Sequence, residues 1–291
     1  MESRFACVLD VKASLGECPT WSADEQVLYW VDINAPSLNR FDPKGGANTA
    51  WAMPQAIGSF ALRSRGGFVA ALRDGIWFVD AQGAPERKIA PAPYDPAHHR
   101  FNDGRADPHG RFWVGSMNEK RDTNSARLYR LSPDLGLSPM LDDMMISNGL
   151  GFSPDGRTLY HADTPARTVR AYDFDGAQGT LSSGRVFARF DGETDRPDGA
   201  AVDSEGCYWC AFYSGGKLVR LSPQGRLLAE YPIPAMCPTM CAFGGDDLRT
   251  LYVTTARQRR DADELARLPQ SGGIFAMRVE VAGLPEPKFA G

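Results

Sequence analysis

The chain has 291 residues, 43% of them hydrophobic, and a formal net charge of −4. This acidic balance argues against a nucleic-acid partner, and no stretch is long and apolar enough to predict a membrane span. The first residues lack the basic region and apolar run of a secretory leader. We therefore expect a cytoplasmic protein whose six cysteines are reduced.

In chain order, an early strand at about 5–11 precedes a phrase that recurs along the sequence. The phrase is a turn followed by a strand rich in aromatic and β-branched residues, and it occurs at 22–32, 64–72, 107–115, 153–163, 203–211 and 244–254. Its aligned strand residues are Tyr29, Val69, Trp113, Tyr160, Trp209 and Tyr252, spaced by 40, 44, 47, 49 and 43. Periods of roughly 40–50 residues with several short strands each are typical of propeller blades.

Between the repeats lie further predicted strands, at 127–133, 168–174 and 217–225, and a late strand at 272–281 follows the sixth phrase. We predict an all-β fold, a single six-bladed β-propeller over residues 1–291. The N-terminal strand would complete the last blade and remove the open sheet edges. Two longer connections, 84–101 and the charged stretch 256–271, are candidates for specificity loops, the second with a helical turn.

One position of the repeat carries oxygen-bearing side chains. Eight residues before the aligned turn residues (Glu25, Gly66, Gly110, Gly156, Gly206 and Leu248) stand Glu17, Gly58, Asn102, Asn148, Asp198 and Met240. Equivalent positions of a closed ring face one central channel, and four of these six offer oxygen ligands that suit a hard cation. The sequence therefore predicts a metal-binding channel. A turn repeated in each blade is the alternative, because Gly follows both Asn148 and Asp198.

The predicted donor set indicates a catalytic use for the ion. Its donors are all oxygen, and few protein ligands leave open positions for water and substrate. A cation there would polarise a carbonyl and lower the pKa of a bound water, which serves ester or lactone hydrolysis. Asp198 is the candidate catalytic residue, as the general base that takes the proton of water.

Several segments resemble one family over nearly the full length. They are LGECPTW (15–21), RFNDGRADPHGRFWVGSM (100–117), ISNGLGFSPDGRTLYHADT (146–164), RPDGAAVDSEGCYW (196–209) and AFGGDDLRTLYVTTA (242–256). Together they resemble the regucalcin and gluconolactonase-like sugar lactonases. The resemblance implies a six-bladed propeller with a divalent ion in the channel, held by Glu17, Asn148 and Asp198. It also implies substrate contacts at Arg100, Asn102 and Glu119, with Asp103 beside the site.

Two positions near these motifs need separate mention. Cys18 stands where the family usually has Gly, which would tighten the pocket or place a thiol near the metal. Arg196 and Arg100 occupy the same position of the repeat, since each lies two residues before a predicted channel residue. Arg196 is therefore a candidate for a substrate contact or for a structural salt bridge beside the site.

The leading hypothesis is a metal-dependent lactonase that opens a sugar 1,4- or 1,5-lactone to the aldonic acid. Its one divalent ion would be calcium, zinc, magnesium, manganese or iron(II), and its partner a small-molecule sugar lactone, with no obligate protein partner evident. One alternative is an esterase or organophosphatase on the same scaffold. Another is a non-enzymatic calcium-binding propeller.

Overall fold

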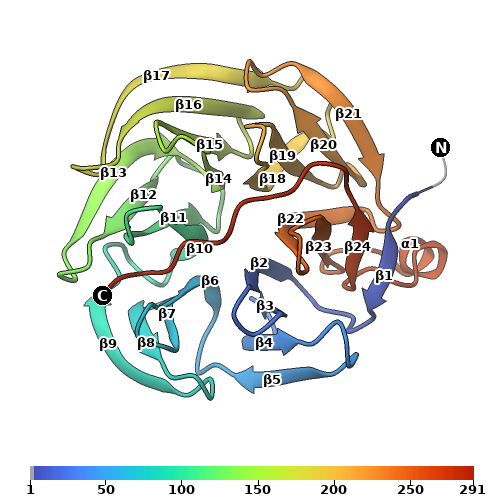
Figure 1. Ribbon diagram of the computed structural model, residues 1–291, viewed down its shortest axis with the longest axis horizontal. Coiled ribbons are helices and arrows are strands. Elements are labelled where there is room, and N and C mark those ends of the chain that lie inside the picture. Colours follow the sequence, from blue (N-terminus) through green and yellow to red (C-terminus); the bar gives the residue numbers. More distant parts are fainter. Residues whose placement is uncertain (1–2) are drawn as a thin grey trace.

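Six four-stranded antiparallel sheets form a ring in this computed structural model, which describes residues 3–291 (Figure 1). The predicted six-bladed β-propeller is confirmed. In each sheet the innermost strand faces the centre of the ring and the outermost strand faces solvent. Within residues 3–291, no helix is both long enough and apolar enough for a membrane crossing.

The first three sheets follow the chain from the inside outward. They comprise β2 (Gly16–Ser22), β3 (Val27–Asp32), β4 (Ser37–Phe41) and β5 (Asn48–Ala52); β6 (Ile57–Leu62), β7 (Phe68–Leu72), β8 (Gly75–Val79) and β9 (Pro85–Pro91); and β10 (His99–Ala106), β11 (Phe112–Asn118), β12 (Ala126–Leu131) and β13 (Leu137–Met144). The expected long connection at 84–101 includes strand β9 and the start of β10, so only residues 84 and 92–98 lie outside strands there.

The fourth and fifth sheets keep the same order. They comprise β14 (Ser147–Phe152), β15 (Thr158–Asp163), β16 (Thr168–Asp175) and β17 (Thr180–Arg189), then β18 (Arg196–Val202), β19 (Tyr208–Tyr213), β20 (Lys217–Leu221) and β21 (Leu227–Pro232). Neighbouring innermost strands contact each other all around the ring. All residues of β2, β6 and β14 are buried, as expected for strands packed on both faces.

The sixth sheet combines a strand from the N-terminal part of the chain with three strands from its C-terminal part. Its order is β22 (Cys237–Gly244), β23 (Thr250–Ala256), β24 (Ile274–Arg278) and, outermost, β1 (Ala6–Leu9). β1 pairs antiparallel with β24, so the N-terminal segment hydrogen-bonds to the last strand of the chain. Between β23 and β24, the expected helical turn is helix α1 (Ala262–Arg267), whose N-cap Asp261 accepts a hydrogen bond from the Glu264 amide.

A buried aspartate anchors the turn of two blades and explains part of the repeated phrase. Asp107 accepts a hydrogen bond from Trp113 Nε1 at 2.9 Å, and Asp203 accepts one from Trp209 Nε1 at 2.9 Å. Each aspartate also accepts two backbone amides of its turn. The turn and its following strand are therefore joined to the blade core by one carboxylate.

The C-terminal segment, residues 283–291, crosses the ring after the sixth sheet (Figure 1). Gly283 forms a bridge with Asp203, and Phe289 forms one with Arg63. The Phe289 side chain is fully buried, and its amide donates to Leu62 O at 2.8 Å. Glu286 pairs with Arg105 at 3.1 Å. The segment thus connects blades that are distant in sequence.

Candidate functional site

Each innermost strand has a break in register at the position singled out by the repeat. The register of the six strands shifts between Glu17 and Thr20, Ile57 and Ser59, Phe101 and Gly104, Asn148 and Gly151, Pro197 and Ala200, and Pro238 and Met240. A β-bulge inserts an extra residue and re-aims the neighbouring side chains. The glycines after Asn148 and Asp198 therefore lie in bulges inside strands, so the alternative of a repeated turn is wrong.

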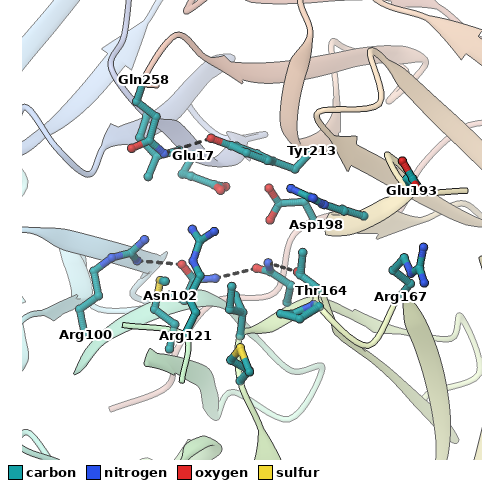
Figure 2. Close-up of a pocket in the computed structure, with 17 residues that line it drawn as sticks. Glu17, Arg100, Asn102, Arg121, Thr164, Arg167, Glu193, Asp198, Tyr213 and Gln258 are labelled. Atoms are coloured by element: carbon teal, nitrogen blue, oxygen red, sulfur yellow. Dashed lines mark hydrogen bonds between the residues drawn. The ribbon is translucent and has the colours of Figure 1, made fainter. Parts of the chain in front are cut away.

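Four of the six repeat positions line one cavity of about 560 Å³. They are Glu17, Asn102, Asn148 and Asp198, all buried (Figure 2). The remaining two positions carry no oxygen ligand. A side chain at Gly58 would meet the carbonyl oxygen of Phe101 at 2.3 Å, so only glycine fits there, and Met240 is apolar and buried.

The two carboxylates of the cavity face each other in Figure 2. Burial, and after it the negative charge of Asp103, raises the pKa of Glu17 to about 8. Burial, followed by the charges of Glu17 and Asp103, raises the pKa of Asp198 well above its ordinary value. Within residues 3–291 neither carboxylate has an ion-pair partner at 4.0 Å or less. Both carboxylates are thus poised to take up a proton or a cation.

A chain of hydrogen bonds orients the amides on the opposite wall. Arg100 Nη1 donates to Asn102 Oδ1 at 2.7 Å, and Asn102 Nδ2 donates to Asn148 Oδ1 at 2.7 Å. Asn148 Nδ2 donates to Thr164 Oγ1 at 2.7 Å, and Thr164 in turn donates to Pro197 O at 2.7 Å. This series of hydrogen bonds ends at Pro197, one residue before Asp198. It fixes four residues of the innermost strands relative to one another.

The site residues suit a divalent cation by their chemistry. Glu17 and Asp198 supply two carboxylates that lack a cationic partner among residues 3–291, and Asn148 Oδ1 keeps a lone pair beyond the one used by Asn102. Across residues 3–291, no group of three or more His, Cys, Asp and Glu side chains gathers as a metal cluster. Two carboxylates with one amide form a sparse oxygen set of the kind that hard cations accept.

The other predicted site residues take different places. Arg196 lines the cavity and is exposed. Asp103 is buried behind the cavity, where its Oδ2 accepts the Leu150 amide at 3.0 Å, and burial raises its pKa. Glu119 is not part of the cavity lining. Arg73 holds its two carboxylate oxygens at 2.6 and 3.0 Å, and Arg100 Nε lies 3.8 Å away, so Glu119 touches Arg100 from outside the cavity.

Cys18 is directed away from the carboxylates. Its backbone has a φ of 48°, in the left-handed region where glycine is at ease, which accounts for the usual glycine of the resembling family. Its thiol lies 3.5 Å from Phe60 O and 3.8 Å from Gly104 O, on two neighbouring innermost strands. The thiol therefore fills space between strands, and burial raises its pKa to about 12.

The sequence does not indicate six polar or charged residues of the cavity lining: the uncharged Thr164, Tyr213 and Gln258, and the charged Arg121, Arg167 and Glu193. Gln258 Nε2 donates to the Tyr213 hydroxyl at 3.3 Å, near the carboxylates in Figure 2. Gln258 belongs to the connection 256–271, which the sequence indicates as a candidate specificity loop without pointing to this residue. Thr164 directly follows β15, outside the repeat position that selects the other oxygen ligands.

Comparisons with known proteins find related sequences that match along the whole chain. A family model described as SMP-30/Gluconolactonase/LRE-like region matches residues 15–257. A 6-deoxy-6-sulfogluconolactonase from Pseudomonas putida is 50% identical over 293 residues, which is 100% of each chain. Regucalcin from Oryctolagus cuniculus is 35% identical, with 99% of each chain covered.

Solved structures show the same architecture. A calcium-binding protein, regucalcin from Agrobacterium tumefaciens, matches with a TM-score of 0.93 at 30% identity and covers 98% of this chain and 97% of its own. A gluconolactonase from Xanthomonas campestris matches with a TM-score of 0.75 at 22% identity, covering 98% of this chain and 90% of its own. At that identity, the second structure shows a shared fold alone.

Proposed function

Since the chain belongs to the SMP-30/gluconolactonase/LRE-like family and is a lactonase, we propose that it opens an aldonolactone to the aldonic acid with the help of one divalent metal ion. The observation that carries this proposal is the meeting of Glu17, Asn148 and Asp198 in one cavity. Two buried carboxylates without a cationic partner are costly in a folded protein unless a cation or a proton neutralises them.

In this proposal Glu17, Asn148 and Asp198 hold the ion. A divalent ion bound there supplies a Lewis acid for the lactone carbonyl and acidifies a nearby water. Asp198 accepts the proton of the attacking water as its oxygen bonds to the carbonyl carbon. When the bond from this carbon to the ring oxygen breaks, Asp198 returns the proton to that oxygen, which becomes the free hydroxyl of the hydroxy acid.

Arg100 and Asn102 act on the substrate in this proposal. Arg100 is buried, and burial lowers its pKa, yet it keeps its charge beside Glu119. Its guanidinium would hydrogen-bond sugar hydroxyls and the carboxylate of the product. Glu119 would then position Arg100 rather than touch the substrate. Asp103 would add to the negative charge that draws a cation toward Glu17 and Asp198.

The test is lactone hydrolysis by metal-stripped protein with metals added back one at a time. The first substrates are glucono-1,5-lactone and its C6-sulfonated analogue, because the Pseudomonas relative is named for the latter. Simple aryl esters and an organophosphate serve as competitors. We expect lactone hydrolysis that vanishes on chelation and returns with one or more divalent ions.

Other results would favour the competing functions. Faster turnover of esters or organophosphates than of any lactone would support the esterase alternative. Metal binding without hydrolysis of any substrate would support a calcium-binding propeller. Activity that survives complete removal of metal would contradict the proposed role of the ion.

A further inference from the structure

Three arginines line the outer part of the cavity in addition to the buried Arg100. We call Arg121, Arg167 and Arg196 the rim arginines. Within residues 3–291, none of them has a carboxylate within 4.0 Å, whereas Arg73, Arg100 and Arg105 are all paired with glutamates. Unpaired positive charges therefore collect at the mouth of a cavity in a chain whose net charge is −4.

The backbone holds two of the rim arginines in unusual conformations. Arg121 follows β11 with a φ of 56°, and Arg167 precedes β16 with a φ of 52°. Their amides close turns on Asn118 O and Thr164 O, each at 3.1 Å. Left-handed conformations are uncommon for residues other than glycine, so the two turns fix the course of the backbone at both arginines.

The charges around Arg121 repel one another. Burial, and then the positive charge of Arg259, lowers the pKa of Arg121, and Arg196 adds to the effect. Glu193 is the one exposed carboxylate among the residues that line this cavity. Figure 2 shows Glu193 near Arg167 and away from Arg121. Three arginines with no carboxylate within 4.0 Å among the described residues give the mouth of the cavity a positive charge that favours an anion.

We propose that the rim arginines form an anion subsite, which binds a sulfonate or phosphate group carried on the exocyclic carbon of the lactone. This proposal rests on the proposed lactonase function and adds a charged substituent to the substrate. Neutral sugar hydroxyls need no such concentration of charge. A tetrahedral anion offers three acceptor oxygens, which match the fixed donor pairs of guanidinium groups.

The placement of the groups separates the two tasks of the cavity. Glu17, Asn148 and Asp198 are buried, whereas Arg121 and Arg196 are exposed and Arg167 is half-buried. Hydrolysis would take place at the buried end, while the rim would hold the anionic end of the same molecule. A positive rim would also raise the association rate for anionic lactones, an effect that salt weakens.

The experiment compares kcat/KM for three lactones that differ at C6: hydroxyl, sulfonate and phosphate. It uses the wild-type protein, the single variants Arg121→Gln, Arg167→Gln and Arg196→Gln, and the triple variant. Arg189→Gln is the matched control, because Arg189 is an exposed arginine at the end of β17, outside the cavity. The ratio of kcat/KM between an anionic lactone and glucono-1,5-lactone is the measured preference.

We expect the wild type to prefer one anionic lactone by at least about tenfold, and each single variant to lose about two- to fivefold of that preference. The triple variant should lose at least about tenfold of that preference. Arg189→Gln should behave as wild type. The better of the two anionic substrates identifies the anion.

Some outcomes would contradict the proposed anion subsite without contradicting the proposed lactonase function. One is equal kcat/KM for all three lactones in the wild type, and another is a preference that survives in the triple variant. If no lactone is hydrolysed, the proposed function fails and the subsite is judged by calorimetry with 6-deoxy-6-sulfogluconate and 6-phosphogluconate. Binding that weakens at least about tenfold in the triple variant supports the subsite, and absent or unchanged binding refutes it.

Discussion

At the scale of single residues, the paired carboxylates dominate the chemistry of the cavity. Glu17 and Asp198 are buried, face each other and lack a cationic partner among the described residues. Burial raises the pKa of both groups, with a further increase from the charge of Asp103 at Glu17 and from the charges of Glu17 and Asp103 at Asp198. Proton and metal therefore compete for the same two side chains, and substitutions there act on both equilibria.

The substitution Asp198→Asn separates these roles. Asparagine keeps an oxygen that reaches the ion, but it loses the negative charge and the proton acceptor. Metal affinity should weaken, and kcat at saturating metal should fall by about 10²–10⁴-fold, the usual contribution of a general base. Rates must be corrected for spontaneous lactone hydrolysis. A metal-saturated variant with near wild-type kcat would place the base elsewhere.

The raised pKa of Glu17 predicts how stability depends on pH in the metal-free protein. Its pKa is about 8 in the folded state, whereas the ordinary pKa of a glutamate, which we take for the unfolded chain, is 4.5. Between these values the folded protein holds a proton that the unfolded chain releases, so the free energy of unfolding should fall as pH rises, by up to about 1.4 kcal/mol per pH unit. Metal affinity should rise over the same range, because the ion displaces the proton.

Urea unfolding of metal-free protein from pH 5 to 8 measures this dependence. Glu17→Gln is the matched control, since glutamine fills the same space and does not titrate. Its stability should decline less with pH than that of the wild type. Identical pH profiles for the two proteins would rule out Glu17 as the titrating group.

At the scale of the elements, the turn that opens the repeated phrase at 203–211 also anchors its blade. Asp203 accepts hydrogen bonds from Trp209 and two backbone amides, and it pairs with Arg220 at 2.7 Å. The same guanidinium lies 3.0 Å from Glu205, whose side chain is 62% exposed. One arginine thus pairs with a fully buried and an exposed carboxylate.

This arrangement supplies a matched pair of substitutions. Asp203→Ala should lower the free energy of unfolding by about 3–5 kcal/mol, because it leaves buried donors of the blade without partners. Glu205→Ala removes an exposed partner of the same arginine and should cost less than about 1 kcal/mol. Urea unfolding measures both. Equal losses would show that burial of Asp203 adds nothing to its contribution.

At the scale of the whole molecule, two segments connect the ends of the chain to the ring. β1 supplies the outermost strand of the sheet that contains β22, β23 and β24. The C-terminal segment, residues 283–291, crosses to distant blades and buries Phe289 completely. Contacts between blades that are far apart in sequence should raise the cooperativity of unfolding.

Phe289→Ala tests this contribution. Truncation of a fully buried phenylalanine should reduce the free energy of unfolding by about 3–5 kcal/mol. The neighbouring Lys288 forms an exposed ion pair with Asp24, so Lys288→Ala should cost less than about 1 kcal/mol. Thermal and urea unfolding of both variants provides the measurement. A Phe289→Ala protein as stable as the Lys288→Ala protein would mean that the segment is not part of the cooperative unit.

The sequence by itself determined the six-bladed ring and which position of each repeat points toward the central channel. Each repeat is one unit of turn and strand, and local preferences specify both, so Glu17, Asn102, Asn148 and Asp198 could be picked out by counting residues. It left a repeated turn open as an alternative for the glycines after Asn148 and Asp198, which lie in bulges, because a bulge depends on pairing with another strand.

Only the tertiary structure decided which neighbours complete the cavity. Gln258 hydrogen-bonds to Tyr213 of another blade, Glu119 pairs with Arg73, and the rim arginines line one cavity with no carboxylate within 4.0 Å among residues 3–291. These contacts join loops of different length whose paths depend on the packing of whole blades. The local pattern of a sequence specifies periodic structure, whereas contacts between loops form only when the ring closes and brings their side chains together.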